Sequence, residues 1–210
     1  MLLAKNVCKK YNSTILDNVT ISVNDGEVVG VAGANGSGKS TLLSILAGIT
    51  TADTGEIVVD GKIGYVPQET SLFNNLSVKD NLNFWASAYN INLKGQALLS
   101  DKTFLKKRVK HLSGGMKKQL SIDLALLDSP NVLIMDEPTC ALDIGFKGEL
   151  LNRIKKIIED GVGVIFSTHQ PDELLWCDRV YILKEGGFIY EGSPKDVELA
   201  DVLYGEGLDR

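Results

Sequence analysis

Hydrophobic positions follow two different periods along the chain, and the change of period marks the expected elements. Residues 19–23 alternate between apolar and polar side chains, which is typical of a half-buried strand. Residues 28–32 are continuously apolar, the pattern of a strand that is buried on both faces of a parallel sheet. A helix is expected next, from apolar residues at helical spacing: Leu42, Leu43, Leu46 and Ile49.

The same alternation of strand and helix returns in the second half of the chain. Residues 132–135 and 162–166 have the pattern of buried strands, and an amphipathic helix is expected between them. The apolar positions of that helix are Phe146, Leu150, Ile154 and Ile157. Apolar runs at 180–183 and 188–190 flank Lys184-Glu185-Gly186-Gly187, which predicts a hairpin. Alternating elements of this kind predict an α/β fold with a doubly wound parallel sheet.

The chain has the length of one compact domain, with 210 residues. The segment from about 72 to 128 contains no comparable strand pattern and favours helices. We therefore expect a single domain over 1–210. Residues 1–71 and 129–210 would form the α/β core with a β-rich N-terminal lobe, and residues 72–128 an inserted helical subdomain.

Composition and charge exclude several classes of protein. The chain has 22 Lys and Arg against 27 Asp and Glu, a net charge of −5, which gives no electrostatic reason to expect nucleic-acid binding. No run of 18 apolar residues occurs, and the first residues become polar too soon for a signal peptide. The three cysteines form no Cys-x-x-Cys pair. We expect a protein of the reducing cytosol without a membrane span.

Residues 33–40, Gly-Ala-Asn-Gly-Ser-Gly-Lys-Ser, match the phosphate-binding pattern G-x-x-x-x-G-K-[ST]. Successive backbone N–H groups and a helix N-terminus would face an anion, Lys39 would reach the β- and γ-phosphates, and Ser40 would bind Mg²⁺. A glycine-rich turn that only caps a helix is the alternative, but the strand before the loop and the helix after it favour the phosphate site. The expected nucleotide ligands are Gly33, Asn35, Gly36, Ser37, Gly38, Lys39, Ser40 and Thr41.

Two acidic residues and a histidine follow the later strands. Asp136 and Glu137 end the strand 132–135, and ligands of parallel sheets bind beyond the carboxyl ends of the strands. We expect Asp136 to hold Mg²⁺, directly or through water, and Glu137 to accept a proton from the attacking water. His169 follows the next strand and is expected near the γ-phosphate or that water. The alternative roles, a helix cap for the acids and a loop position for the histidine, are disfavoured by the loop 33–40.

The segment Leu112-Ser113-Gly114-Gly115-Met116 resembles the LSGGQ signature of the ATP-binding cassette (ABC) transporter ATPases. Other family motifs follow the same order: Tyr11 at the adenine-stacking position, Gln68 in the Q-loop, 140–143 as the D-loop and His169 as the switch histidine. The resemblance runs from about residue 2 to residue 195. It implies a P-loop NTPase (RecA-like) fold, ATP and Mg²⁺ as cofactors, and a Gln68 that helps to place Mg²⁺ and water.

The signature also forms a second anion-binding helix end. Ser113, Gly114 and Gly115 open a helix, so their backbone donors would face a ligand. In the family this is explained by a head-to-tail dimer, in which Ser113 and Gly115 of one subunit contact the γ-phosphate held by Lys39 of the other. A simple Ser N-cap is the alternative, and it is compatible with the functional role.

Three features depart from the family pattern. Met116 replaces the usual glutamine, Lys117-Lys118-Gln119 stands where the family often has a Gln-Arg pair, and Cys140 replaces the common serine. The sequence Ser-Gly-Gly-Met followed by lysine is similar to the branch that works with ABC-2-type export permeases. The resemblance thus implies an ATP-hydrolysing subunit that forms a homodimer or heterodimer and drives a separate integral membrane permease, for export. It would be peripheral on the cytoplasmic face of the cell membrane.

Two other functions are compatible with parts of the pattern. A permease-free ABC ATPase that acts on the ribosome or DNA is disfavoured by the single cassette and the absence of a heptad run. A nucleotide-sensing regulatory subunit is disfavoured by the complete set of Lys39, Asp136, Glu137 and His169. Leu72 and Phe73, shortly after the Q-loop, could pack the helical lobe or contact a permease helix, and the sequence leaves both readings open.

Overall fold

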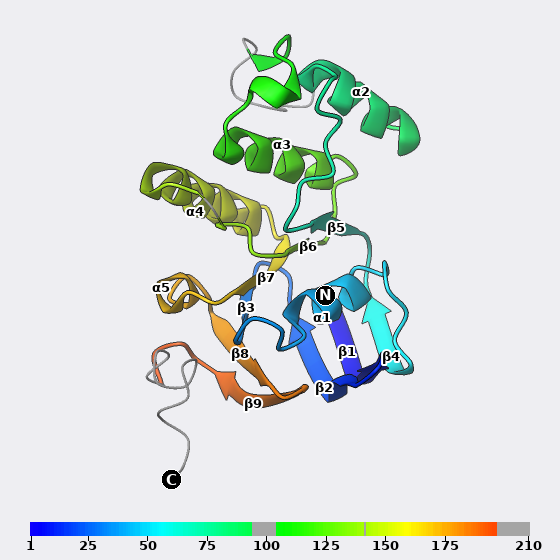
Figure 1. The fold of residues 1–210 in the computed structure, drawn as a ribbon, viewed down its shortest axis with the longest axis vertical. Helices are drawn as coiled ribbons and strands as arrows, with labels where there is room; N and C mark the ends of the chain where they lie inside the picture. Colours follow the sequence, from blue (N-terminus) through cyan, green and yellow to red (C-terminus); the bar gives the residue numbers. More distant parts are fainter. Residues whose placement is uncertain (94–103, 141, 197–210) are drawn as a thin grey trace.

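The computed structural model describes residues 1–93, 104–140 and 142–196, and these form two sheets and a helical lobe (Figure 1). The N-terminal sheet is antiparallel and has the strand order β2-β1-β4. Its strands are β1 (Leu2–Lys10), β2 (Thr14–Val23) and β4 (Thr54–Val59). Val19, Ile21 and Val23 are buried while their neighbours are more exposed, which confirms the expected half-buried strand.

The core sheet has six strands in the order β5-β6-β7-β3-β8-β9. They are β3 (Val28–Ala32), β5 (Ile63–Val66), β6 (Val132–Met135), β7 (Gly163–Thr168), β8 (Arg179–Lys184) and β9 (Gly187–Gly192). All neighbours pair in parallel except β8 and β9, which form the predicted antiparallel hairpin. The expected parallel sheet is therefore confirmed, and the carboxyl ends of β3, β5, β6 and β7 lie along one edge.

Helices cover both faces of the core sheet. The helix α1 (Lys39–Leu46) packs between the two sheets, where its leucines join Val29 and Val31 in one apolar cluster. The helices α4 (Ile144–Glu159) and α5 (Pro171–Leu174) cover the opposite face, which has Val28 and Ala32. One expectation is wrong: Ile49 lies beyond the end of α1 and is 63% exposed. The helix ends early because the chain turns at Gly48, whose φ is 72°.

A helical lobe, which spans α2 to α3, occupies one end of the molecule (Figure 1). It contains α2 (Val78–Ala88), the 3₁₀ turn η2 (Val109–His111) and α3 (Gly114–Leu126). Leu82, Val109 and Leu120 belong to its own apolar cluster, separate from the clusters of the core sheet. No helix among the described residues is both long enough and apolar enough to cross a membrane.

Candidate active site

The loop between β3 and α1 curves its backbone around an open space. Residues 33–38 form this loop, and Gly38 precedes the first residue of α1. The φ of Gly38 is 106°, and a Cβ atom there would lie 3.0 Å from the carbonyl oxygen of Ile15. Glycine is therefore the residue that permits this backbone conformation and the close approach to β2. The free N–H groups at the start of α1 make the loop a site for an anion.

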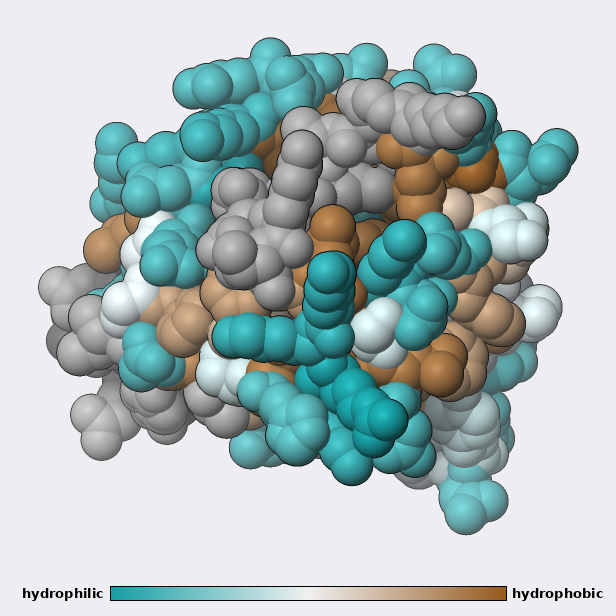
Figure 2. Space-filling view, turned by 90° about the horizontal axis from the view of Figure 1, so that it is seen from above, coloured by the Kyte–Doolittle hydropathy of each residue, from teal (hydrophilic) through white to brown (hydrophobic). Residues whose placement is uncertain are grey.

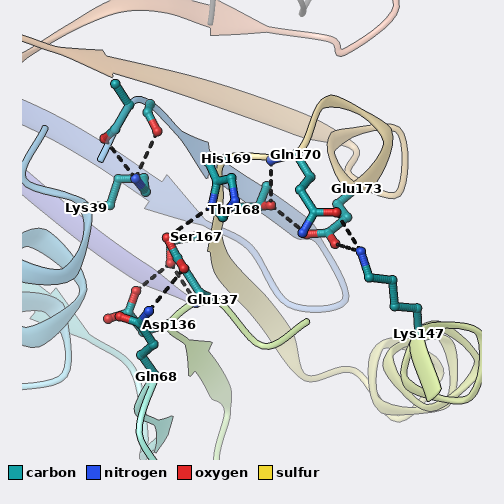
Figure 3. A network of polar contacts seen from close by, with 12 residues as sticks. Lys39, Gln68, Asp136, Glu137, Lys147, Ser167, Thr168, His169, Gln170 and Glu173 are labelled. Carbon is teal, nitrogen blue, oxygen red and sulfur yellow. Dashed lines mark hydrogen bonds and ion pairs between the residues drawn. The ribbon is translucent and has the colours of Figure 1, made fainter. Parts of the chain in front are cut away.

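Lys39 points its ammonium group into the curve of this loop. Its Nζ donates to the carbonyl oxygens of Gly33, at 2.9 Å, and Ala34, at 3.0 Å (Figure 3). Only 5% of Lys39 is exposed, and this burial lowers the pKa of its ammonium, while Glu137 and Asp136 oppose that shift. The loop thus holds a positive charge that faces two carboxylates.

A cavity of about 620 Å³ opens beside the loop. It is lined by three segments: 13–15, 33–37 and 182–186. The Ser37 hydroxyl is buried there without a hydrogen-bond partner among the residues that the structure describes. Tyr11 does not line this cavity; the residue is 58% exposed, and the centroid of its ring lies 5.2 Å from Nζ of Lys9. Ile15 and Glu185 line the cavity although no motif marked them, because they come from β2 and the β8–β9 turn.

Asp136 and Glu137 leave the end of β6 and are both held by a serine of the neighbouring strand. The Ser167 hydroxyl donates to Oδ1 of Asp136 at 2.6 Å and accepts the backbone N–H of Glu137 at 2.9 Å. Asp136 is 3% exposed. Ser167 therefore orients the Asp136 carboxylate and fixes the backbone of Glu137. Sequence reasoning did not single it out, since a lone serine inside a strand has no distinctive pattern.

The carboxylate of Glu137 meets the side chains that end two other strands (Figure 3). Gln68, which follows β5, donates from Nε2 to Oε2 of Glu137 at 3.2 Å. His169, which follows β7, places Nδ1 3.4 Å from Oε1 of the same carboxylate. The Glu137 side chain is 12% exposed and that of His169 is 43% exposed, so the group remains open to solvent on the histidine side.

The loop of His169 is held by a second polar network (Figure 3). The Thr168 hydroxyl donates to Glu173 at 2.5 Å and accepts the backbone N–H of Gln170 at 3.0 Å. Lys147, on α4, donates to Gln170 at 2.6 Å and pairs with Glu173 at 3.1 Å. Glu173 is 1% exposed, so its charge depends on these partners. The network ties the loop of His169 to the helix that follows the D-loop.

The signature lies in the helical lobe, away from the loop before α1 (Figure 1). Ser113 caps α3, because its hydroxyl accepts the backbone N–H of Met116 at 3.2 Å. Ser113 and Gly114 are exposed, whereas Gly115 is buried. One copy of the chain thus brings together Lys39 and the residues around Glu137, but not the signature.

The chemistry of this donor set fits a nucleoside triphosphate and Mg²⁺. Ser40 is exposed and offers a hydroxyl, Asp136 a carboxylate and Gln68 an amide oxygen, and hard oxygen donors of this kind suit Mg²⁺. Lys39 and the unpartnered hydroxyl of Ser37 offer donors to phosphate oxygens. The arrangement can hold a triphosphate at the loop and a water molecule beside Glu137.

Comparisons of the sequence and of the structure with known proteins indicate the same family. The family model described as ABC transporter matches residues 16–140. The linearmycin resistance ATP-binding protein LnrL of Bacillus subtilis (strain 168) is 35% identical over 94% of this chain and 70% of its own length. The lipopolysaccharide export system ATP-binding protein LptB of Escherichia coli (strain K12) is 30% identical over 93% of this chain and 92% of its own length. The dimeric ATP-binding cassette MJ0796, bound to ADP and Pi, superposes with a TM-score of 0.82 at 27% identity. The superposition covers 92% of this chain and 99% of the MJ0796 chain.

The family match spans the phosphate loop, the signature and the two acids after β6. The fold agrees as well, because the structural neighbours cover nearly the whole chain. The chain therefore belongs to the ABC transporter family, as an ATP-binding subunit that hydrolyses ATP.

Proposed function

We propose that two copies of the chain, or one copy and a related subunit, close head to tail around ATP and drive a separate membrane permease. The proposal rests mainly on one observation: the exposed start of α3 and the loop of Lys39 lie in different lobes of one chain (Figure 1). Two helix N-termini that both suit an anion can share one phosphate only across a subunit boundary. The dimeric form of the MJ0796 cassette supports this arrangement.

The residues around the loop have separate parts in hydrolysis. Lys39 binds the β- and γ-phosphate oxygens, and Mg²⁺, held by Ser40, Asp136 and Gln68, would neutralise charge that develops on those oxygens. Glu137 accepts a proton from the attacking water as the bond from the γ-phosphorus to the bridging oxygen breaks. ADP and phosphate are released, and a proton returns to solvent.

The remaining residues orient these groups. Gln68 donates to one oxygen of Glu137 and holds the carboxylate in place for the attacking water. His169 lies on the exposed side of the same carboxylate, where it can contact the γ-phosphate. Tyr11 is proposed to stack on the adenine, because its side chain is exposed. Thr41, on the first turn of α1, completes the phosphate contacts.

An aromatic row supports a permease as the partner. Phe73 meets Phe84 at 4.7 Å between ring centroids, Phe84 meets Trp85 at 5.5 Å and Trp85 stacks on Tyr89 at 6.0 Å. Three of the four rings, all but Trp85, are more than 40% exposed. A cavity of about 550 Å³ adjoins the row and is lined by Ile49, Tyr65, Pro67, Leu72, Trp85 and Tyr89 among others.

Seen from the end that bears α2 and α3, hydrophobic side chains reach the surface between hydrophilic ones (Figure 2). Exposed aromatic side chains with a polar surround are the usual energetic centre of a protein interface. Because the cavity is lined by Pro67, the residue before Gln68, a permease segment bound there would lie next to the residue that contacts Glu137. Export is supported by the relatives LnrL and LptB, which are named for linearmycin resistance and for lipopolysaccharide export.

The proposal is tested by purifying tagged chain from detergent-solubilised membranes. We expect an integral membrane protein to co-purify in fixed ratio, and the reconstituted pair in lipid vesicles to hydrolyse ATP faster than the chain alone. Recovery with ribosomes or DNA instead, or an ATPase rate that the membrane protein leaves unchanged, would contradict the permease assignment.

A further inference from the structure

The signature helix α3 contains a buried lysine, which contacts the backbone of the Q-loop. Lys118, on α3, is 5% exposed. Its Nζ donates to the backbone carbonyl oxygens of Pro67 and Gln68, each at 3.1 Å. None of the carboxylates that the structure describes forms an ion pair with it. Two carbonyl groups of the Q-loop are therefore the direct partners of a buried ammonium.

Burial of this ammonium has an energetic cost, because an unpaired charge loses its hydration. Desolvation lowers the pKa of Lys118, and the nearby Asp136, Cys140 and Glu137 oppose that shift. Hydrogen bonds to a charged donor are stronger than neutral ones, so the two carbonyls are held more firmly than by an amide or hydroxyl.

The two carbonyls belong to the segment that places the Gln68 side chain. On the strand side, the backbone N–H of Asp136 donates to the carbonyl of Val66 at 2.9 Å and fixes the end of β5. Lys118 holds the next two residues from the helical lobe. From this fixed backbone, the Gln68 amide reaches Glu137 at 3.2 Å. A continuous chain of contacts thus joins Lys118 to the carboxylate that is proposed to activate water.

We propose that Lys118 is a positioning residue for ATP hydrolysis: it fixes the Pro67–Gln68 backbone and thereby sets where the Gln68 amide meets Glu137. The inference rests on the roles proposed above for Gln68 and Glu137. Lys118 also lies five residues after Ser113 on the same helix, about 7.5 Å along its axis. A shift of the signature on dimer closure would therefore move the backbone of Gln68 directly.

The first experiment measures steady-state hydrolysis of Mg·ATP by the purified chain. Lys118→Met keeps the hydrocarbon stem but removes the donors, and kcat is expected to fall roughly 10- to 100-fold because the reacting groups are misplaced. KM for ATP should stay near the wild-type value, since Lys39 and its loop are untouched. Lys118→Arg, which restores two donors, should recover most of the rate. Lys110→Met, an exposed lysine of the same lobe, is the matched control and should hydrolyse ATP normally.

The second experiment asks whether Lys118 acts through Gln68. In a double-mutant cycle, Lys118→Met should lower kcat little further once Gln68→Ala is present. Independent losses that multiply in the double mutant, or a wild-type kcat for Lys118→Met alone, would overturn the proposal. If Lys118→Met does not fold, as judged by its melting curve, Lys118→Gln enters the same cycle and the same two outcomes decide. These rates need no permease, so failure to find one leaves this test unaffected.

Discussion

The ring of Phe146 lies over Gly115, so that a Cβ atom at position 115 would collide with the ring carbons. Phe146 belongs to the first turn of α4, and its backbone N–H donates to the carboxylate of Asp143 at 3.0 Å. The signature helix and the helix that follows the D-loop thus pack through a glycine and an aromatic ring. Packing within one chain is a reason for glycine at position 115 in addition to its proposed contact with phosphate.

Gly115→Ala is expected to lower the melting temperature by several degrees, because overpacking at this contact costs about 1–3 kcal/mol. Phe146→Leu in the same chain should restore part of the loss, since a smaller side chain makes room for the methyl group. Gly148→Ala on α4 is the matched control, because a Cβ there meets nothing within 4 Å. Differential scanning calorimetry measures the melting temperature of each variant. An unchanged melting temperature for Gly115→Ala would refute the contact.

Glu137→Gln should retain ATP binding but lose turnover by about 10²- to 10⁴-fold, because an amide cannot accept the proton of the attacking water. ATP should then accumulate a dimer that light scattering detects in the presence of Mg²⁺. Glu159→Gln, an exposed position at the end of α4, should hydrolyse ATP normally and remain monomeric. A wild-type rate for Glu137→Gln would show that another group is the base.

Ser113→Arg should leave ATP binding by the isolated monomer intact and prevent the dimer that Glu137→Gln accumulates. The reason is that an exposed arginine at the signature would block the neighbouring subunit's phosphate site. Ser77→Arg tests the general effect of replacing a helix cap in this lobe, since Ser77 caps α2. Equal loss of ATP binding and dimer formation in the Ser113 variant would place its contact within one chain.

Phe73 and Leu72 are neighbours with opposite surroundings, and their substitutions should separate partner binding from stability. Leu72 is 9% exposed and packs in the helical lobe, so Leu72→Ala should lower stability by about 2–5 kcal/mol. Phe73 is 41% exposed, so Phe73→Ala should melt almost normally and keep basal ATPase activity. It should nevertheless fail to co-purify with the permease. Normal permease binding by Phe73→Ala would remove this residue from the interface.

Removal of Mg²⁺ with a chelator should abolish hydrolysis, and excess Mg²⁺ should restore it. Asp136→Asn should require a higher Mg²⁺ concentration for half-maximal rate, because a neutral amide is a weaker ligand than a carboxylate. The measurement is a Mg²⁺ titration at saturating ATP. Hydrolysis that persists in the chelator, or an unchanged Mg²⁺ requirement in Asp136→Asn, would exclude the proposed ligand.

The parts of the fold that have a local signal could be predicted from the sequence. The strand 132–135 coincides with β6, because four successive apolar residues suit a strand that is buried on both faces. The parallel arrangement then follows from the alternation of strands and helices, and it brings Gln68, Glu137 and His169 to one edge.

Other features depend on residues that are far apart in the chain, and local patterns do not predict them. Lys118 looks like an exposed helix residue until α3 is packed against the end of β5. The buried carboxylate of Glu173, which accepts the Thr168 hydroxyl, finds its ion-pair partner Lys147 on α4 only in the folded chain. Ile49 has the spacing of a position on α1, but the chain turns at Gly48, so Ile49 lies beyond the helix and is exposed.

The backbone of Glu137 has a φ of 42°, a region that is strained for residues with a side chain. Glycine would adopt it without that cost, which is on the order of 1–3 kcal/mol, but it has no carboxylate to offer. The strain turns the chain sharply after β6 and directs the Glu137 carboxylate toward Gln68 and His169. Position 137 therefore represents a compromise between thermodynamic stability and activity, in which folding free energy is given up to place one functional group.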